Sequence, residues 1–383
     1  MITAEQVLLS ERTTLHLGGP AARFTEAATE EALVAAVRRA DAEAEPVLVL
    51  GGGSNLVVAD EGFPGVVVLA ASHGLEFAAR GESVAVTVAA GHDWDDFVQC
   101  CLAEGLSGVE CLSGIPGRAG ATPIQNVNAY GQDVAHTITS VRVYDRLTGR
   151  VMVMPAAECG FGYRTSVFKR QAAGSGRGAE LNPAAATGRF VVLAVTFALP
   201  VSRLSAPVRY GELSRVLGVE PGGRVPLTDA RAAVLQLRRG KGMVLDPADP
   251  DTRSAGSFFT NPVVTAGQHA GLAARNPADG PAGGADGSGA ADGGGIPHWP
   301  ADDGQVKLSA AWLIEHAGFS KGFRLAGDEN GARISTKHAL ALTNPRNGST
   351  ASLIRLASHI RAGVLAEFGV ELANEPVLVG VAL

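Results

Sequence analysis

Three residues of this sequence could do chemistry because their polar side chains stand in apolar or glycine-rich surroundings: Arg164, Ser257 and Glu375. Arg164 lies in the segment CGFGYRTSVFKR, directly after a tyrosine. An unpaired charge in apolar surroundings is costly, so this guanidinium needs an anionic partner. A substrate carboxylate could accept two hydrogen bonds from it, and a structural salt bridge is an equal alternative. The neighbouring Lys169 is expected to be a solvated surface charge.

Ser257 and Glu375 each stand beside apolar residues that would limit access of water. Ser257 precedes two aromatic residues in SAGSFFTNP, and its hydroxyl could donate a proton. No G-x-S-x-G elbow and no convincing histidine or aspartate partner supports nucleophilic hydrolysis, and most serines are structural. Glu375 precedes a proline in the apolar run ELANEPVLVG. Carboxylates in such surroundings are costly and often functional, with capping or arginine pairing as the alternative.

A glycine-rich turn follows an apolar strand in LVLGGGSNLVV. Glycine lets consecutive backbone N–H groups wrap a diphosphate without help from basic side chains. The segment is neither G-x-G-x-x-G nor a Walker loop, because the Lys-Ser/Thr pair is missing and an apolar strand follows. An ordinary turn is the more frequent alternative. The residues concerned are Gly51, Gly52, Gly53, Ser54 and Asn55.

A second candidate binding segment is CLSGIPGRAGATPIQNVNAYGQDV, which has no helical period. Its glycines and prolines fix an irregular path, and its small residues leave room for a planar ring system. Long irregular segments of this kind are usually functional, although an ordinary surface loop is the alternative. Tyr130 within it could equally be a half-buried structural aromatic.

Composition limits the possible partners. The 383 residues suffice for two or three domains, and 38 acidic against 32 basic residues give a net charge of −6. This charge argues against binding to nucleic acid or anionic membranes. Four cysteines without CxxC spacing indicate reduced, mostly buried thiols, and nine scattered histidines predict no metal site. Because neither a leader nor about 18 consecutive apolar residues occur, we expect a cytoplasmic protein.

The pattern of apolar residues predicts a mixed α/β chain. Strands are expected to end at Leu50, Leu69 and Ala90, and a further strand covers 189–199. A hairpin is expected from 140–145 and 151–155, and helices from 95–105, 228–240 with Thr228 as N-cap, 307–318 and 349–368. The Gly/Ala-rich segment 171–188 reads as a flexible insertion, and 266–304 is expected to be disordered.

The order of several segments resembles the UDP-N-acetylenolpyruvoylglucosamine reductase family, also called UDP-N-acetylmuramate dehydrogenases. The resemblance rests on TTLHLGGPA, GGGSNL, SGIPGRAGATPIQN, AYG, GYRTSVFK, YGEL, AGSFFTNP, KLSAAWLIEHAGFSKG and NEPVLVG. It implies an α+β fold with a two-part FAD-binding module of the vanillyl-alcohol-oxidase type and an α/β substrate domain. The implied units are FAD subdomains at 1–70 and 71–202, a substrate domain at 203–369, and a segment at 370–383 that returns to the active site.

The resemblance also implies a reaction and its residues. NADPH would reduce non-covalently bound FAD, and the enolpyruvyl group of UDP-N-acetylglucosamine enolpyruvate would then be reduced to give UDP-N-acetylmuramate for peptidoglycan synthesis. Arg164 and Glu375 would hold the substrate carboxylate and the developing enol, and Ser257 would donate a proton. FAD contacts are implied for the first glycine loop and for Ile115, Pro116, Gly117, Gly120, Ala121, Ile124 and Tyr130. Substrate contacts are implied for Tyr210, Lys241 and Asn261.

Two departures and two alternatives accompany this resemblance. Asn128 stands where the family usually has glycine, but asparagine tolerates positive φ, so the loop should still form. Lys241 precedes GMVLDP, a longer spacing than usual for the family. An FAD oxidase of the same cofactor fold is one alternative, although the early loops lack a histidine or cysteine for covalent flavin. A non-catalytic nucleotide-sugar binding protein is another. We expect the protein to be a monomer.

Overall fold

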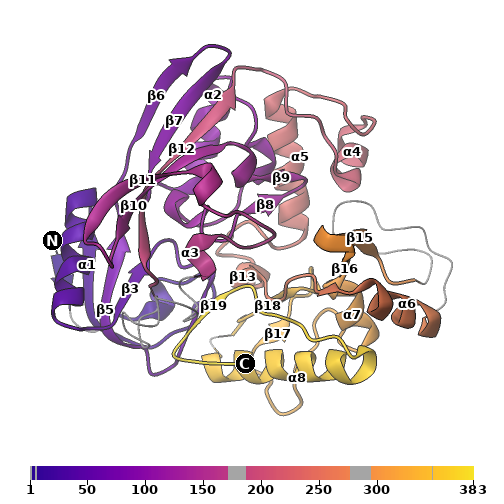
Figure 1. Cartoon of the computed structure of the whole chain (residues 1–383). Helices are drawn as coiled ribbons and strands as arrows, with labels where there is room; N and C mark the ends of the chain where they lie inside the picture. Colours follow the sequence, from indigo (N-terminus) through magenta and orange to yellow (C-terminus); the bar gives the residue numbers. More distant parts are fainter. Residues whose placement is uncertain (1, 5–6, 171–186, 277–294, 347) are drawn as a thin grey trace.

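The computed structural model describes residues 2–4, 7–170, 187–276, 295–346 and 348–383. Within these ranges the chain forms two larger sheets beside a carboxyl-terminal group of helices and short strands (Figure 1). The expected α+β class is confirmed. In the described ranges, no helix is both long and apolar enough to cross a membrane.

The first sheet has the strand order β1-β2-β5-β3, made by Ile2–Ala4, Ala21–Ala27, Phe63–Ala70 and Val47–Leu50. β2, β5 and β3 run parallel, and β1 pairs with β2 in the antiparallel sense. Parallel strands are commonly buried on both faces, which explains the continuous apolar runs in β3 and β5. α1 (Glu30–Ala42) packs on this sheet through Leu33 and Val37. It begins where the Thr29 hydroxyl accepts a hydrogen bond from the Ala32 N–H.

The second sheet is antiparallel, with the order β11-β10-β12-β7-β6. Its strands are Arg150–Pro155, Ile138–Asp145, Phe190–Pro200, Ser83–Ala89 and Leu75–Arg80. β10 and β11 form the expected hairpin. α2 (Trp94–Ala103) packs against the sheet through Trp94 and Phe97, whose rings lie 5.9 and 4.9 Å from that of Phe197. Gly105, with φ of +70°, lies just beyond its end, as the sequence indicates.

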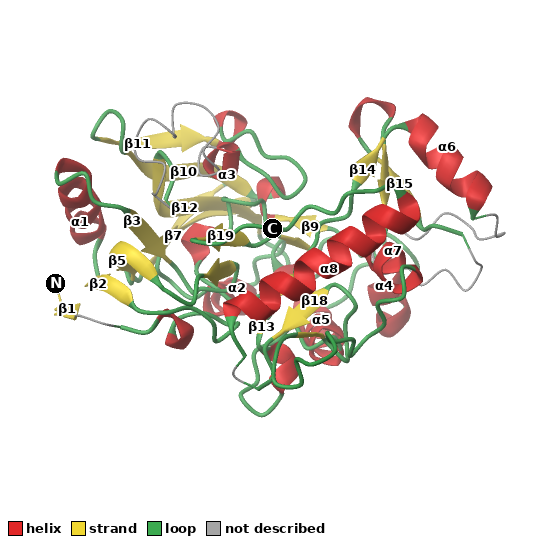
Figure 2. Cartoon of the chain, turned by 90° about the horizontal axis from the view of Figure 1, so that it is seen from below, coloured by secondary structure: helices red, strands yellow, loops and turns green. Residues whose placement is uncertain are grey.

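The carboxyl-terminal part contains two small antiparallel sheets and several helices. One sheet, β13-β18-β17, comprises Ser254–Ser257, Ala341–Thr343 and Arg333–Ile334; the other, β14-β16-β15, comprises Val263–Val264, Val306–Leu308 and His298–Pro300. α8 (Thr350–Phe368) lies across this part (Figure 2) and buries the apolar face that the sequence predicts. The other helices are α3 (Val167–Arg170), α4 (Gly211–Leu217), α5 (Leu227–Gly240), α6 (Ala266–Arg275) and α7 (Ala310–His316).

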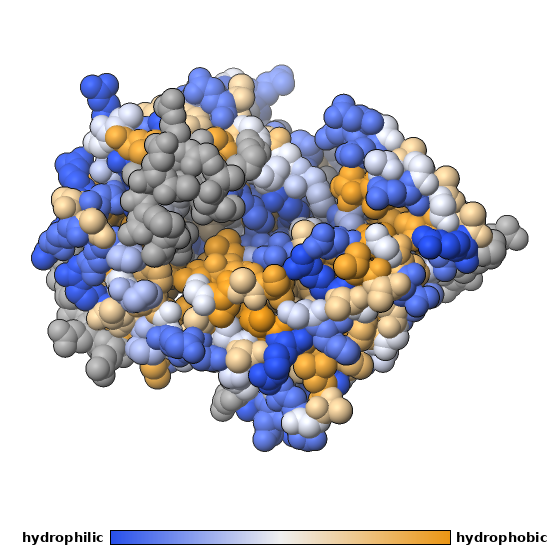
Figure 3. Space-filling model, turned by 60° about the horizontal axis from the view of Figure 1, so that its bottom comes forward, coloured by the Kyte–Doolittle hydropathy of each residue, from blue (hydrophilic) through white to orange (hydrophobic). Residues whose placement is uncertain are grey.

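The surface seen obliquely from below is largely hydrophilic towards its ends, with hydrophobic residues gathered over its middle (Figure 3). Larger apolar side chains form buried clusters, and one of these packs Leu313 of α7 and Leu356 of α8 against Leu342 of β18. Three of the four cysteines are buried and Cys100 is exposed, as expected for mostly buried thiols.

The end of the chain returns to the segment after the first glycine loop. β19 (Val377–Val379) pairs in parallel with β4 (Leu56–Val58), and the Val377 N–H donates to the Asn55 carbonyl at 2.9 Å. Just before β19, the Thr260 N–H donates to the Ala373 carbonyl at 3.0 Å. Residues 373–379 therefore connect the glycine loop with the segment after β13. The domain boundaries given above remain a prediction.

Several sequence expectations are wrong in part. Disorder was expected over 266–304, but α6 occupies its beginning and β15 lies near its end. α6 has no apolar periodicity that would predict a helix, since Leu272 is its only buried residue. A capping box between Thr265 and Gln268 stabilises its start. Residues 277–294, like 171–186, lie outside the described residues. α5 begins at Leu227, so Thr228 lies inside the helix and does not cap it.

Candidate active site

A single cleft, with a cavity volume of about 640 Å³, contains every site residue expected from the sequence. Its walls come from both large sheets, from α5, and from the strands β13 and β19. The expected residues in its lining are Gly51, Gly52, Gly53, Ser54, Asn55, Ile115, Pro116, Gly117, Gly120, Ala121, Ile124, Tyr130, Arg164, Tyr210, Lys241, Ser257, Asn261 and Glu375. The fold thus brings together segments that are up to 324 positions apart in the sequence, from Gly51 to Glu375.

The first glycine loop, residues 51–55, connects β3 to β4 along the wall of the cleft. Among the residues that the structure describes, none accepts a hydrogen bond from the backbone N–H groups of this loop. A Cβ on Gly52 would lie 2.7 Å from the Gly117 Cα, so the loop packs backbone to backbone against the second segment. Gly53 has φ of +62°, and a Cβ there would overlap the Arg12 carbonyl. Free N–H groups on a glycine loop fit an anionic diphosphate.

The second binding segment follows an irregular path held by its own contacts. A Cβ on Gly120 would lie 2.5 Å from the Ala90 Cβ, which explains why a glycine stands there. The Asn126 side chain donates to the Gly162 carbonyl and accepts from the Ala135 N–H, each at 3.1 Å. These contacts keep an apolar stretch that includes Ile115 and Ile124 on the cleft wall. Such a wall fits the flat face of a ring system.

Asn128 does not need the backbone conformation expected for it. It lies in the two-residue strand β8 (Asn128–Ala129), which pairs with β9 (Gln132–Asp133), and its φ is not positive. The left-handed residues nearby are Asn126 (φ +48°) and Tyr130 (φ +50°). The explanation based on φ is therefore wrong for Asn128, because a strand conformation accepts any residue with a side chain.

Tyr130, Tyr210 and Lys241 form a second group at the cleft. The rings of Tyr130 and Tyr210 meet edge to face with centroids 5.0 Å apart. The Lys241 ammonium lies 5.8 Å from the Tyr130 centroid and 2.5 Å from the Glu212 carboxylate. Burial raises the pKa of Tyr130 to about 12, so its hydroxyl keeps its proton at neutral pH. Lys241 thus lines the cleft despite its unusual spacing from the Asp-Pro pair.

Arg238 is a cleft residue that the sequence analysis missed. It lies three residues before Lys241 in the last turn of α5, and its guanidinium donates to the Met243 carbonyl at 2.7 Å. Its Nε has no hydrogen-bond partner among the described residues. Burial lowers the pKa of Arg238 to about 10, which still leaves it charged at neutral pH. The i, i+3 spacing to Lys241 was the available signal, since such residues share a helix face.

Arg164 and Glu375, which are far apart in the sequence, are brought together in the cleft. The Arg164 Nε lies 3.3 Å from the Glu375 Oε1, but it is not aligned for a hydrogen bond. Arg164 has φ of +53°, an uncommon conformation that is often held at functional sites. Both side chains are largely enclosed yet line the cleft. The salt bridge and a substrate contact are therefore compatible, because the guanidinium has further donors.

Lys169 is not the solvated surface charge that was expected. Its Nζ donates to the backbone carbonyl of Glu375 at 3.2 Å, and the side chain lines the cleft. Burial lowers the pKa of Lys169, with nearby Glu375 opposing this effect. The expectation failed because α3 ends beside the returning segment 373–379, a neighbour that local sequence does not reveal.

Ser257 ends β13 and faces the cleft from the substrate-side strands. Its backbone pairs with Ala341, and its hydroxyl makes no hydrogen bond to the other described residues. Asn261 lies four residues further on, and its side-chain oxygen accepts from the Ala310 N–H at 2.9 Å. That oxygen is therefore engaged at the start of α7, and only its amide NH₂ is left for a ligand.

Lys307 and Trp299 add a further wall that the sequence analysis missed. The Lys307 ammonium lies 4.6 Å from the ring centroid of Tyr163 and 5.9 Å from that of Trp299. Both Lys307 and Trp299 line the cleft from the sheet β14-β16-β15. Burial lowers the pKa of Lys307. Trp299 was not considered as a site residue because disorder was expected over 266–304.

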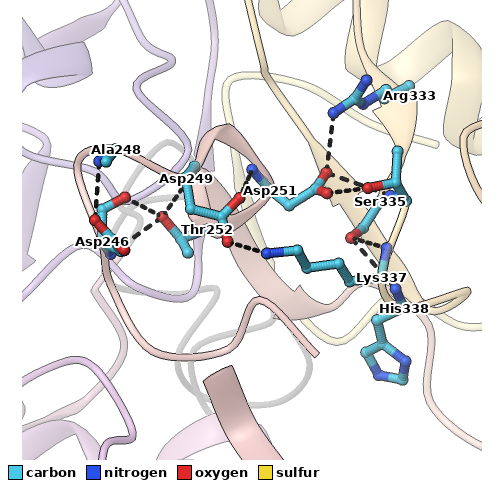
Figure 4. A network of polar contacts seen from close by, with 10 residues as sticks. Asp246, Ala248, Asp249, Asp251, Thr252, Arg333, Ser335, Lys337 and His338 are labelled. Carbon is cyan, nitrogen blue, oxygen red and sulfur yellow. Dashed lines mark hydrogen bonds and ion pairs between the residues drawn. The ribbon is translucent and has the colours of Figure 1, made fainter. Parts of the chain in front are cut away.

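His338 lines the cleft and follows a network of polar contacts around Asp251 (Figure 4). Asp251 accepts hydrogen bonds from Thr336 and from Arg333, the latter at 3.1 Å, and Lys337 pairs with Asp249 at 2.5 Å. The His338 ring points away from these contacts (Figure 4). Burial, together with Lys241, Lys321 and Arg238, lowers the pKa of His338 to about 4. The imidazole is therefore neutral at physiological pH.

Replacing His338 with glutamine should reduce the loss of unfolding free energy that occurs when the pH is lowered. Because the pKa of His338 is about 4 in the folded protein and 6.5 ordinarily, the unfolded chain binds this proton more readily. Stability is then lost as the pH falls from the ordinary value towards the folded one. Between about pH 7 and about pH 5 the native chain should lose about 2 kcal/mol more than His338→Gln.

Urea unfolding at the two pH values measures this difference, with His136→Gln at an exposed position as control. Equal losses in native protein and His338→Gln would show that His338 does not contribute to acid sensitivity.

Comparison with known proteins shows that the chain contains an FAD-binding domain. Residues 21–154, which include the first glycine loop, match the family model described as FAD binding domain. With the free N–H groups of that loop and the apolar wall beside it, the chain is a flavoprotein oxidoreductase with an FAD-binding module of the expected type. Residues 247–379 match the model described as UDP-N-acetylenolpyruvoylglucosamine reductase, C-terminal domain.

The relatives cover the whole chain. It is 53% identical to the UDP-N-acetylenolpyruvoylglucosamine reductase of Thermobifida fusca, over 99% of each protein, and 52% identical to that of Salinispora arenicola, over 98% of this chain and 95% of the relative. The chain therefore belongs to the UDP-N-acetylenolpyruvoylglucosamine reductase family. The crystal structure of this enzyme (MurB) from Thermus caldophilus aligns with a TM-score of 0.59 at 26% identity, covering 98% of this chain and 99% of the other. The expected family and fold class are confirmed.

Proposed function

We propose that this chain converts UDP-N-acetylglucosamine enolpyruvate to UDP-N-acetylmuramate in peptidoglycan precursor synthesis, with non-covalently bound FAD and with NADPH as hydride donor. The observation that carries the proposal is the meeting of Arg164, Ser257 and Glu375 in one cleft with two glycine-rich backbone segments. Family membership supports the reductase over the oxidase alternative. FAD bound in the cleft and reduced by NADPH would supply the hydride for the enolpyruvyl double bond.

The side chains of the chain would handle the charge and the proton. Arg164 binds the substrate carboxylate, which removes the cost of a guanidinium that is largely enclosed. Once the substrate carboxylate becomes the partner of Arg164, Glu375 would hold a proton, and both side chains would stabilise the negative charge that develops on the carbon next to the carboxylate. Ser257 donates the proton that completes the lactyl ether, which is feasible because a carbanionic carbon is a strong base. The hydroxyl of Ser257, which has no hydrogen-bond partner among the described residues, suits this step.

The remaining cations would hold the nucleotide. Arg238 and Lys241 both line the cleft near the end of α5. A diphosphate would accept from the Arg238 guanidinium and share Lys241 with its partner Glu212. Asn261 contributes its amide NH₂. The same cleft would bind NADPH and the sugar nucleotide in turn, because both carry anionic phosphates and must reach the same flavin ring.

An anaerobic absorbance titration tests the reaction. Purified protein should be yellow, its flavin band should bleach on addition of NADPH, and the band should return when UDP-N-acetylglucosamine enolpyruvate is added. Titration with NADH in parallel measures the preference between the two donors. Colourless protein would contradict FAD binding, and recovery with oxygen alone would favour the oxidase.

We further propose a cytoplasmic monomer that binds neither nucleic acid nor membrane. All proposed site residues belong to one chain, and the net charge of −6 disfavours polyanions. Light scattering of the purified protein tests the oligomeric state.

A further inference from the structure

Gln125 forms a bridge that the reaction outlined above does not use. Its Oε1 accepts a hydrogen bond from the Asn55 Nδ2 at 2.5 Å, and its Nε2 donates to the Glu375 Oε1 at 3.3 Å. The three residues come from the first glycine loop, the second binding segment and the chain end, and all of them line the cleft. One amide therefore links the proposed cofactor loop to the proposed catalytic carboxyl group.

The two contacts determine the orientation of the amide. An amide has an oxygen that only accepts and an NH₂ group that only donates. With the oxygen of Gln125 occupied by Asn55, the NH₂ group faces Glu375. The Glu375 Oε1 also has the Arg164 Nε at 3.3 Å. The Arg164 Nε is not aligned for a hydrogen bond, so it contributes positive charge beside this oxygen, and the donor is the Gln125 NH₂ group. An oxygen that accepts from this amide beside a guanidinium is held as an acceptor, so a proton on this carboxyl group would reside on Oε2.

The backbone of Glu375 is fixed by other groups. Its N–H donates to the Phe258 carbonyl at 2.8 Å, and its carbonyl accepts from the Lys169 Nζ at 3.2 Å. β19 follows directly and pairs with β4. These contacts place the Cα of Glu375 without Gln125. Gln125 instead restricts rotation of the Glu375 carboxyl group about its side-chain bonds.

We propose that Gln125 is a positioning residue that holds the Glu375 Oε1 as an acceptor and so directs the proton on Oε2 into the cleft. This inference rests on the proposed role of Glu375 in the reaction. In the absence of the bridge, the carboxyl group rotates and its proton no longer meets the developing enol. Reduction of the flavin by NADPH does not need that proton, so the effect is confined to the second half of the reaction.

The test compares the two half-reactions in Gln125→Met, which keeps the length of the side chain and removes both hydrogen bonds. Flavin reduction by NADPH should stay within about threefold of the native rate, and reoxidation by the enolpyruvyl substrate should slow about 10- to 100-fold. Gln236→Met, at an exposed position of α5, controls for the substitution itself.

A double-mutant cycle separates positioning from a structural role. Because Gln125 acts through Glu375, Gln125→Met should slow reoxidation by no more than about twofold in a Glu375→Gln background. A second variant, Gln125→Glu, keeps the volume but places an acceptor against Glu375, and it should give the same confined loss. Flavin content measures whether each variant folds.

The outcomes distinguish this inference from the proposed reaction. If native protein is not reoxidised by the enolpyruvyl substrate, the reaction and the inference both fail. If native protein is reoxidised but Gln125→Met matches it, slows both halves equally, or adds its full effect to Glu375→Gln, the reaction stands and the positioning role is overturned.

Discussion

Replacing Ser257 with alanine should leave reduction of the flavin by NADPH intact and slow its reoxidation by the enolpyruvyl substrate about 10³-fold or more. Ser257 lies at the end of β13, where the backbone pairs with Ala341 and the hydroxyl has no partner among the described residues. Removing that oxygen breaks no internal contact, so the fold and the flavin site should persist. The proton it donates is needed only after hydride reaches the substrate. Stopped-flow absorbance under anaerobic conditions measures each half-reaction separately.

Ser254 gives a matched control on the same strand. Its hydroxyl accepts from the Gly256 N–H at 3.3 Å, so Ser254→Ala removes a structural contact three residues away. Any effect of that change should fall on both half-reactions alike. A comparable loss of both halves in Ser257→Ala would contradict the proton-donor role and assign Ser257 a structural function.

Local sequence patterns predicted the elements that carry strong periodicity. β3 and β5 are continuous apolar runs, and the apolar residues of α8 recur once per helical turn. In each element these apolar residues are the ones that are mostly buried. α6 escaped because its single buried residue, Leu272, leaves no periodicity to detect. The start of α5 was misplaced because Thr228 is a common cap residue, whereas Pro226 fixes the turn before the helix.

The site was predictable where function constrains short segments. The glycine loops were recognisable because glycine lets the backbone approach a ligand closely and adopt positive φ. Gln125, Lys169 and His338 were missed because their roles come from contacts across the fold. Gln125, for instance, meets a residue 250 positions away. The local sequence around a glutamine, lysine or histidine does not indicate which distant residue it will contact.

The end of the chain, residues 373–379, contacts both the cofactor side and the substrate side of the cleft. Glu375 is tied by its backbone to Phe258 on one side, and β19 ties the next residues to β4 on the other. The proposed catalytic carboxyl group is thus placed by the cofactor side and the substrate side together. A disturbance of either side should reach it, which makes the packing of the glycine loops a sensitive point.

Replacing Gly52 with alanine should weaken FAD binding about 100-fold, because the two glycine-rich segments can no longer touch. The new Cβ would lie 2.7 Å from the Gly117 Cα and 3.2 Å from its carbonyl carbon. Backbone atoms cannot rotate away as a side chain can, so the segments must separate. The N–H groups of the loop would then no longer face the same side of the cleft as Ile115 and Pro116. Flavin fluorescence titration of the apoprotein measures the dissociation constant.

Gly51→Ala is the matched control, since a Cβ there would meet only the Arg118 side chain at 3.6 and 3.7 Å, an ordinary contact. This variant should keep its flavin far better than Gly52→Ala, although both change one glycine of the same loop. Thermal unfolding of the two apoproteins checks that the difference lies in the cofactor site. If Gly52→Ala bound FAD as tightly as Gly51→Ala, contact between the two segments would not determine affinity, and the free N–H groups of the first loop would have to suffice alone.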